Sequence, residues 1–283
     1  MAFWRGLGFA ALVLLGVVIA TLRGIDVARK QPVIAELHLP PAFAAARDFD
    51  FGRYRLSWRG QGFVVYPRSR PEKVLWAVDG GFLAAGTGQA EPDSLKPGQE
   101  LRDRRELICR EQSLEAFERL GSKLMLKGRL RCVDGSLSRY VVALVDDGER
   151  GLVLEVTLEN PDLNRLFLSW RREAGERVFG FGDASGAYDM SGRRMVVPAA
   201  GSSPVEEGGS VAAQAFYATS RLRAFHSQSA AYQLFDLREP QRVGLEVHER
   251  WLVARIYKGD SPEELREHQA SVVGVVSTPP PAK

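Results

Sequence analysis

Short segments of β character recur from residue 49 almost to the C-terminus, with no long helical pattern between them. Apolar and polar residues alternate around Tyr54, Leu56 and Trp58, and comparable runs include GFVVYP, RYVVALVDDG, GLVLEVTLEN and WLVARIY. Turn residues separate such runs every 8–12 residues or so, a spacing of about one turn per strand that is typical of antiparallel sandwiches and barrels. A parallel sheet would need helices between its strands. The sequence therefore predicts an all-β fold, an antiparallel β-sandwich, over residues 49–260.

One strand shows the alternation with particular clarity. From residue 124 to residue 132 apolar side chains take the even positions, and lysine or arginine takes the odd positions from 127 onwards. A period of two predicts one buried and one solvated face. Gly128 falls on the buried face, where it predicts a bulge or the close approach of another backbone.

A single helix is well signalled, at residues 261–274. Ser261, Pro262 and Glu264 supply an N-cap, a proline in the first helical position and the acidic partner of a capping box. Gly274 is placed to end the helix. Residues 275–283 contain three successive prolines and predict an extended tail.

The N-terminus carries an apolar run. Residues 7–22 read LGFAALVLLGVVIATL, without a charged side chain. Such a run predicts a transmembrane helix that acts as a signal anchor, or a cleaved signal peptide, within residues 1–30. Basic residues are more numerous after the run than before it, which favours a cytoplasmic body. A signal anchor or a signal peptide would instead export the body of the chain. We expect a membrane-anchored, periplasmic or extracytoplasmic domain, joined to the apolar run by a linker at 31–48.

Composition and motifs exclude several classes of function. The 38 basic and 35 acidic residues nearly cancel, and no basic run points to nucleic acid. Two cysteines and four scattered histidines offer little to a metal site. The stretch GFGDASG lacks the following helix that a dinucleotide site needs. We expect no nucleic acid, no metal and no cofactor.

Neighbouring carboxylates, which are candidates for catalytic groups, occur as three pairs at 146–147, 206–207 and 263–264. Glycoside hydrolysis needs two carboxyl groups across a bond, and neighbours in sequence do not supply that geometry. A hairpin turn, a loop and the helix cap explain the three pairs. His226 has no evident acidic partner. The residues therefore indicate no catalytic group.

Cys109 and Cys132 lie on two predicted strands. They would form a disulfide in an exported domain, and would be buried thiols in a cytoplasmic one. The sequence leaves both alternatives open.

Four segments together resemble glycoside hydrolase family 31, the alpha-glucosidase and sulfoquinovosidase group, in its N-terminal β-sandwich domain. They are the WAVDGGFLAAG segment, the stretch from NRLFLSW through GERVFGFGDASGAYDMSGRRMVV, the strand pair QAFYATSRLRAFHSQSAAYQLFDL, and RIYKGDSPEELREHQASVVG. The resemblance covers roughly residues 50–280. It implies a sandwich of the galactose-mutarotase-like supersandwich type.

The chain also departs from the pattern of the family. Asp183 and Ala184 stand where the family has Glu-Gln, and Leu222 replaces the glycine that follows the Ser-Ser-Arg pattern. In the family a (β/α)8 barrel follows the helix and carries the catalytic carboxylates, and the chain stops where that barrel would start. The resemblance thus implies that this chain is not an enzyme on its own.

Together with the apolar run at 7–22, the resemblance implies a membrane-anchored, non-catalytic domain that acts as a scaffold for a glycosidase or as its carbohydrate-contacting half. Its expected partners are a separate (β/α)8 barrel polypeptide, a glycan, and the membrane through residues 7–22. The alternatives are a stand-alone carbohydrate-binding module of the cell envelope or an inactive truncated remnant. The residues expected to contact carbohydrate are Asp183, Tyr188, Arg193 and Arg194.

Overall fold

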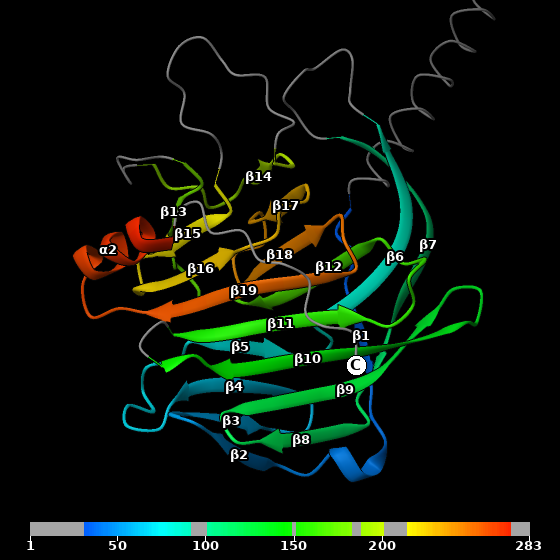
Figure 1. Ribbon diagram of the computed structural model, residues 1–283, viewed down its shortest axis with the longest axis horizontal. Coiled ribbons are helices and arrows are strands. Elements are labelled where there is room, and N and C mark those ends of the chain that lie inside the picture. Colours follow the sequence, from blue (N-terminus) through cyan, green and yellow to red (C-terminus); the bar gives the residue numbers. More distant parts are fainter. Residues whose placement is uncertain (1–30, 92–100, 149–150, 183–187, 201–213, 273–283) are drawn as a thin grey trace, which may run out of the picture.

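The computed structural model describes residues 31–91, 101–148, 151–182, 188–200 and 214–272 (Figure 1). In these ranges it contains nineteen strands, one α-helix and a short 3-10 helix, η1 (Pro41–Phe43). The all-β prediction is confirmed, and the strand pairings are antiparallel except for one between β1 and β7.

The strands form two sheets. The smaller sheet has the order β2 (Arg47–Phe51), β3 (Tyr54–Trp58), β4 (Gly62–Pro67) and β5 (Trp76–Asp79). The larger runs in the order β13 (Val178–Gly180), β15 (Phe216–Thr219), β16 (Arg223–Ser227), β19 (Trp251–Lys258), β11 (Leu152–Leu158), β10 (Leu137–Asp146), β9 (Lys123–Cys132), β7 (Arg102–Ser113), β6 (Leu83–Glu91), β12 (Arg165–Arg171), β18 (Arg242–Val247), β17 (Gln233–Asp236) and β14 (Arg194–Val197). Two further strands join it at the side, β1 (Glu36–His38) beside β7 and β8 (Ala116–Leu120) beside β9.

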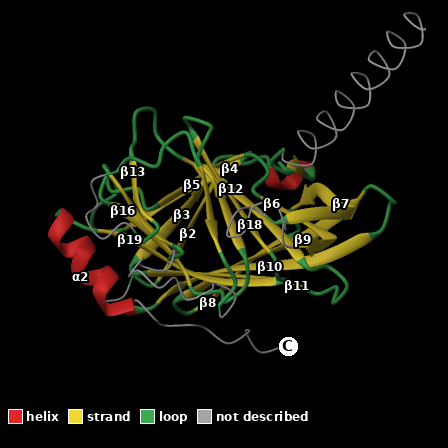
Figure 2. Ribbon diagram, turned by 90° about the horizontal axis from the view of Figure 1, so that it is seen from above, coloured by secondary structure: helices red, strands yellow, loops and turns green. Residues whose placement is uncertain are grey.

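One continuous apolar core is lined by both sheets, whose strands are seen from above in Figure 2. Leu56 and Trp58 of the small sheet and Leu126, Leu154 and Leu252 of the large sheet are fully or almost fully buried in it. Leu56 and Trp58 alternate with polar neighbours, whereas Leu126 and Leu252 alternate with less buried neighbours that include Met125, Trp251 and Val253. The period of two therefore builds the core on these strands.

Gly128 confirms the expectation of a close backbone approach. A Cβ atom at this position would collide with the carbonyl oxygen of Ser113 on the neighbouring β7. That oxygen also accepts a hydrogen bond from the Tyr140 hydroxyl at 2.7 Å. Only glycine leaves room for both contacts.

The helix α2 (Pro262–Val272) begins as the sequence predicts. The backbone N–H of Glu264 donates to the Ser261 hydroxyl at 3.2 Å, and the Glu264 carboxylate accepts from the Asp260 N–H at 2.6 Å. These two bonds satisfy donors that an uncapped helix would leave free. The predicted end of the helix at Gly274 and the tail at 275–283 lie outside the described residues.

Residues 31–48, the predicted linker, contain short elements of regular structure. They contain β1, η1 and the start of β2, and Ala35 is buried. The segment lacks a regular alternation in sequence, and β1 forms only by parallel pairing with a strand more than 70 residues later. Pairing of that kind leaves no local pattern.

Within the described ranges, no helix has both the length and the apolar character needed to cross a membrane. The apolar run at 7–22, on which the transmembrane prediction depends, lies outside these ranges.

Candidate functional site

The segments that carry the family resemblance lie side by side in the structure. Strands β13, β15, β16 and β19 are consecutive neighbours in the large sheet, although they span residues 178–258 (Figure 1). Helix α2 covers the outer face of this part of the sheet. Leu265 of the helix is buried against Phe216, Ala224 and Tyr257. We call this region, with strands β13, β15, β16 and β19 and helix α2, the α2 corner.

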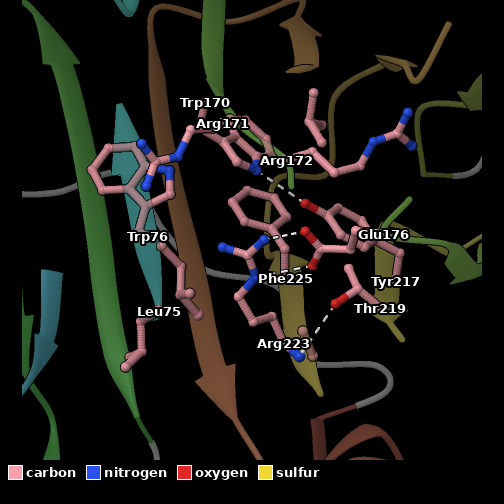
Figure 3. A pocket seen from close by; sticks show the side chains of 13 residues that line it. Leu75, Trp76, Trp170, Arg171, Arg172, Glu176, Tyr217, Thr219, Arg223 and Phe225 are labelled. Atoms are coloured by element: carbon pink, nitrogen blue, oxygen red, sulfur yellow. Dashed lines mark hydrogen bonds and ion pairs between the residues drawn. The ribbon is translucent and has the colours of Figure 1, made fainter. Parts of the chain in front are cut away.

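The WAVDGGFLAAG segment, which begins at Trp76, reaches the inner side of the α2 corner. Trp76 of β5 lines a small pocket together with Trp170, Tyr217 and Phe225 (Figure 3). Trp170 stacks on Phe225 with 4.8 Å between ring centroids, and its indole N–H donates to the Tyr217 hydroxyl at 3.1 Å. The pocket has a volume of about 20 Å³, which is room for a water molecule and not for a sugar.

A buried ion pair forms the polar side of this pocket. The Arg223 guanidinium donates from Nε to Glu176 Oε1 at 3.0 Å and from Nη2 to Glu176 Oε2. The side chain of Glu176 is 0% exposed and that of Arg223 is 11% exposed. Burial alone would raise the pKa of Glu176, but the hydrogen bonds and charge of Arg223 outweigh burial and lower it.

Two turns at the α2 corner contain residues other than glycine in the left-handed region. Leu222 has φ 56° and Phe181 has φ 60°. Leu222 lies in the turn from β15 to β16, where its N–H donates to the Thr219 carbonyl at 2.9 Å and its own carbonyl accepts from Gly259 at 2.9 Å. Leu222 is the residue that replaces the glycine of the family pattern, and the backbone there still has the conformation that suits glycine.

The structure describes three of the four residues predicted to contact carbohydrate. Asp183 lies outside the described residues. Tyr188 is 65% exposed, and Arg193 is an exposed residue whose carbonyl accepts from the Leu237 N–H at 2.9 Å. Arg194 begins β14, pairs in register with Asp236 and lines a cavity of about 30 Å³. Their role in carbohydrate contact stays a prediction.

The neighbouring carboxylates have ordinary partners where the structure describes them. Asp146 accepts hydrogen bonds from Arg53, and Asp147 pairs with Arg255. Glu263 lies 3.5 Å from Arg266, and Glu264 caps the helix. The pair at 206–207 lies outside the described residues.

One cluster has the composition of a metal site. Oxygen and nitrogen atoms of Asp103, Glu246 and His248 lie within 4.8 Å of one another. Arg165 donates to Asp103 at 2.8 Å, and Arg105 donates to Glu246 at 2.7 Å. These guanidinium groups already balance both carboxylates, so a cation would meet positive charge there.

Cys109 and Cys132 form a disulfide. They are opposite each other on β7 and β9, at a point where the register of the pair shifts. Both side chains are buried in the core. Of the two alternatives from the sequence, the structure thus has the disulfide and not the free thiols.

Sequence reasoning missed the ion pair of Glu176 and Arg223. Both residues stand inside the segments that carry the resemblance, Glu176 in GERVFGFG and Arg223 in SRLRAF. Arg223 begins the strand RAFHS, in which every residue is buried. A charged residue in such an apolar strand was the sequence feature that could have indicated a buried partner.

No family model matches the chain, and no curated protein sequence matches it. Among solved structures, a GH31 family sulfoquinovosidase from E. rectale gives a TM-score of 0.52 at 16% identity, over 81% of this chain and 34% of the other. The chain shares its fold with part of a family 31 glycoside hydrolase. The family 31 resemblance is confirmed at this level.

Two further structures are similar to a lesser degree. The GH31 dextranase of Flavobacterium johnsoniae gives a TM-score of 0.32 at 10% identity, over 85% of this chain and 28% of the other. The cycloalternan-degrading enzyme of Trueperella pyogenes gives 0.32 at 14% identity, over 79% and 33%. The chain thus spans about a third of the length of these solved structures.

Proposed function

We propose that this chain is the non-catalytic β-sandwich part of a family 31 glycosidase arrangement and supports a separate (β/α)8 barrel polypeptide. The observation that carries the proposal is the fold match, in which 81% of this chain corresponds to 34% of a GH31 sulfoquinovosidase. The rest of that enzyme has no counterpart in the match. In the proposed assembly, the barrel polypeptide supplies that part.

The carboxylate pairs at 146–147 and 263–264, together with Glu176, support a non-catalytic role. The neighbouring pairs in the described ranges are engaged by arginine side chains or by the start of α2. Glu176 is buried and held by Arg223. Glycoside hydrolysis needs two carboxyl groups across one bond, and these five engaged carboxylates do not supply such a pair.

The α2 corner is the surface that we propose for the barrel. Its position is held by the connection from β4 to β5, because Asp260 pairs with Arg70 at 2.7 Å and also with Lys73. Leu265 packs the helix against the sheet, and Glu267 and most of the other described side chains of the helix are exposed. A helix held in this way can present a rigid face to a partner.

We further propose that the domain is exported and anchored in the membrane through residues 7–22. The Cys109–Cys132 disulfide supports an oxidising compartment, where such bonds form and persist. The glycan contacts of Asp183, Tyr188, Arg193 and Arg194 belong to the same proposal.

The test is affinity capture of the full chain from its native membranes, with mass spectrometry of the retained proteins. We expect a (β/α)8 barrel polypeptide in the captured fraction, and no hydrolysis of 4-nitrophenyl α-glucoside by the purified chain alone. Reversing the charges of Arg266 and Glu267 on α2 should reduce capture of the barrel polypeptide.

A matched control reverses the ion pair of Arg59 and Asp48, which are 3.1 Å apart on the other sheet. This variant should capture the barrel polypeptide as the wild type does. Hydrolysis of the glucoside by the chain alone would refute the non-catalytic role. Equal capture by both charge-reversed variants would remove the α2 corner as the docking surface.

A further inference from the structure

A large open groove adjoins the small pocket of the α2 corner. It has a volume of about 930 Å³ and shares Trp170, Arg171 and Arg172 with the pocket. Its walls come from the end of β5, the end of β12 with the turn that follows, and the β17–β18 hairpin turn at 239–242. This volume falls in the upper part of the range typical of ligand sites, roughly 300–1,000 Å³.

The hairpin wall of the groove is rigidly held by one buried arginine. Arg172 is 4% exposed, and its guanidinium donates to the carbonyls of Glu239 at 2.8 Å and Pro240 at 3.1 Å. Its backbone N–H donates to the Gln241 carbonyl at 2.9 Å. In Figure 3, the side chains of Arg171, at the end of β12, and Arg172, just after it, extend in different directions. Arg172 therefore contacts the hairpin wall, and Arg171 lies on the open side of the groove. A wall fixed in this way is preorganised for a ligand.

The open side of the groove combines donors and acceptors. Arg171 donates to Asp79 at 3.2 Å, and the two side chains remain 39% and 63% exposed. A guanidinium has five N–H donors and a carboxylate about four acceptor positions, so the single bond between them leaves both groups with capacity for a ligand. The exposed Gln241 adds an amide with both functions.

The groove carries no net charge. Its charged lining residues are three arginines and three carboxylates, namely Arg171, Arg172, Arg242, Asp79, Glu173 and Glu239. A strongly anionic or cationic ligand would gain little from such a balance. A neutral ligand whose hydroxyl groups both donate and accept would be able to bond to both signs.

We infer that this groove binds a neutral oligosaccharide through the exposed pair of Arg171 and Asp79. The inference rests on the proposed function, because it assigns a sugar subsite to this domain itself, apart from the barrel. Adjacent hydroxyl groups of a sugar ring would accept from Arg171 and donate to Asp79, while the hairpin turn of Gln241 bounds the site.

The experiment is titration calorimetry of the full chain in a detergent without a sugar headgroup. The ligands are maltotriose, cellotriose and mannotriose, with trigalacturonic acid as an anionic comparator. We expect at least one neutral trisaccharide to bind, and to bind more tightly than the anionic one. Arg171→Ala and Asp79→Ala should each raise its Kd by about tenfold or more, the effect of losing a hydrogen bond to a charged group.

Arg104→Ala is the matched control, since Arg104 is also an exposed strand arginine, paired with Glu106 at 2.8 Å. Its Kd should equal that of the wild type. Surface ion pairs contribute little to stability, so all three variants should remain folded. The inference is overturned if no neutral trisaccharide binds, if the anionic one binds more tightly, or if the groove variants bind as the wild type does.

The same samples separate this inference from the proposed function. Capture of the barrel polypeptide without sugar binding would overturn the groove alone. Sugar binding that depends on Arg171, without a captured barrel polypeptide and without hydrolysis, would support the groove and identify a stand-alone carbohydrate-binding module.

Discussion

Glu176 and Arg223 are 47 residues apart in the chain and form a buried ion pair with two hydrogen bonds. Glu176 lies in the turn before β13, and Arg223 is the first residue of β16. Glu176 also accepts from the Glu173 N–H at 2.9 Å. The pair therefore joins two turns at the α2 corner, and each charge depends on the other for its solvation.

Replacement of Glu176 by glutamine should lower the free energy of unfolding by about 3–5 kcal/mol, because Arg223 would remain buried without its counter-charge. Urea denaturation at pH 7 measures the loss. The double variant Glu176→Gln, Arg223→Met should recover part of it. Glu106→Gln breaks the exposed pair with Arg104 and should cost less than about 1 kcal/mol. Equal losses for the buried and the exposed substitution would contradict this account.

The same ion pair should make the free energy of unfolding depend on pH in the acidic range. The pKa of Glu176 is lowered in the folded protein, since Arg223 outweighs the effect of burial. A lowered folded-state pKa contributes stability above the unfolded pKa of about 4.3, and this is lost as the pH falls through the folded value. The difference in stability between wild type and Glu176→Gln should therefore shrink below about pH 4. A difference that stays constant from pH 7 to pH 3 would rule out the ion pair as its origin.

His226 should weaken the protein between neutral and mildly acidic pH. Burial, with a smaller effect of Arg255, lowers the pKa of His226 from 6.5 to about 4. Below pH 6.5 the unfolded chain takes up a proton that the folded chain does not, so stability falls until the pH reaches the folded value. From pH 7 to pH 5 the wild type should lose about 2 kcal/mol more than His226→Phe, as judged by urea denaturation at both pH values. Parallel losses in the two proteins would show that His226 is not the titrating group.

The Cys109–Cys132 disulfide closes a loop with a sequence separation of 23. Loop-closure entropy predicts that its reduction costs about 3 kcal/mol. Urea denaturation with and without dithiothreitol measures this cost. The double variant Cys109→Ala, Cys132→Ala should be less stable than the oxidised wild type and should not respond to the reductant. A wild type that is equally stable in both conditions would mean that the bond contributes no stability.

At position 222 a glycine variant should be more stable than an alanine variant, which reverses the usual order of stability. Both substitutions remove the contact of the Leu222 side chain with the cluster around Phe216. Only glycine also relieves the positive φ of 56°, which costs other residues about 1–2 kcal/mol. Leu222→Gly should therefore be more stable than Leu222→Ala by about 1 kcal/mol. Ala218, at a strand position nearby, is the control, where glycine should be the less stable residue. An alanine variant at position 222 more stable than the glycine variant would argue against strain in this turn.

Much of the local structure could be predicted from the sequence. Alternation between 124 and 132 predicted β9, Gly128 predicted a close backbone contact, and Ser261 with Glu264 predicted the start of α2. These features are local, because a period of two or a capping box involves residues only a few positions apart. Strand β1, within residues 31–48, could not be predicted in this way because it depends on a partner strand far away in the sequence.

By itself the sequence determined the all-β class, the positions of many strands, the helix cap and the likeness to family 31, since all of these are carried by short-range patterns. Only the tertiary structure decided that Glu176 meets Arg223, that Cys109 meets Cys132, and that Arg171 and Asp79 share the side of one groove. Each of these pairs joins strands or turns whose pairing follows from the order of the sheets. That order is set by burial of a common core, which no local pattern records.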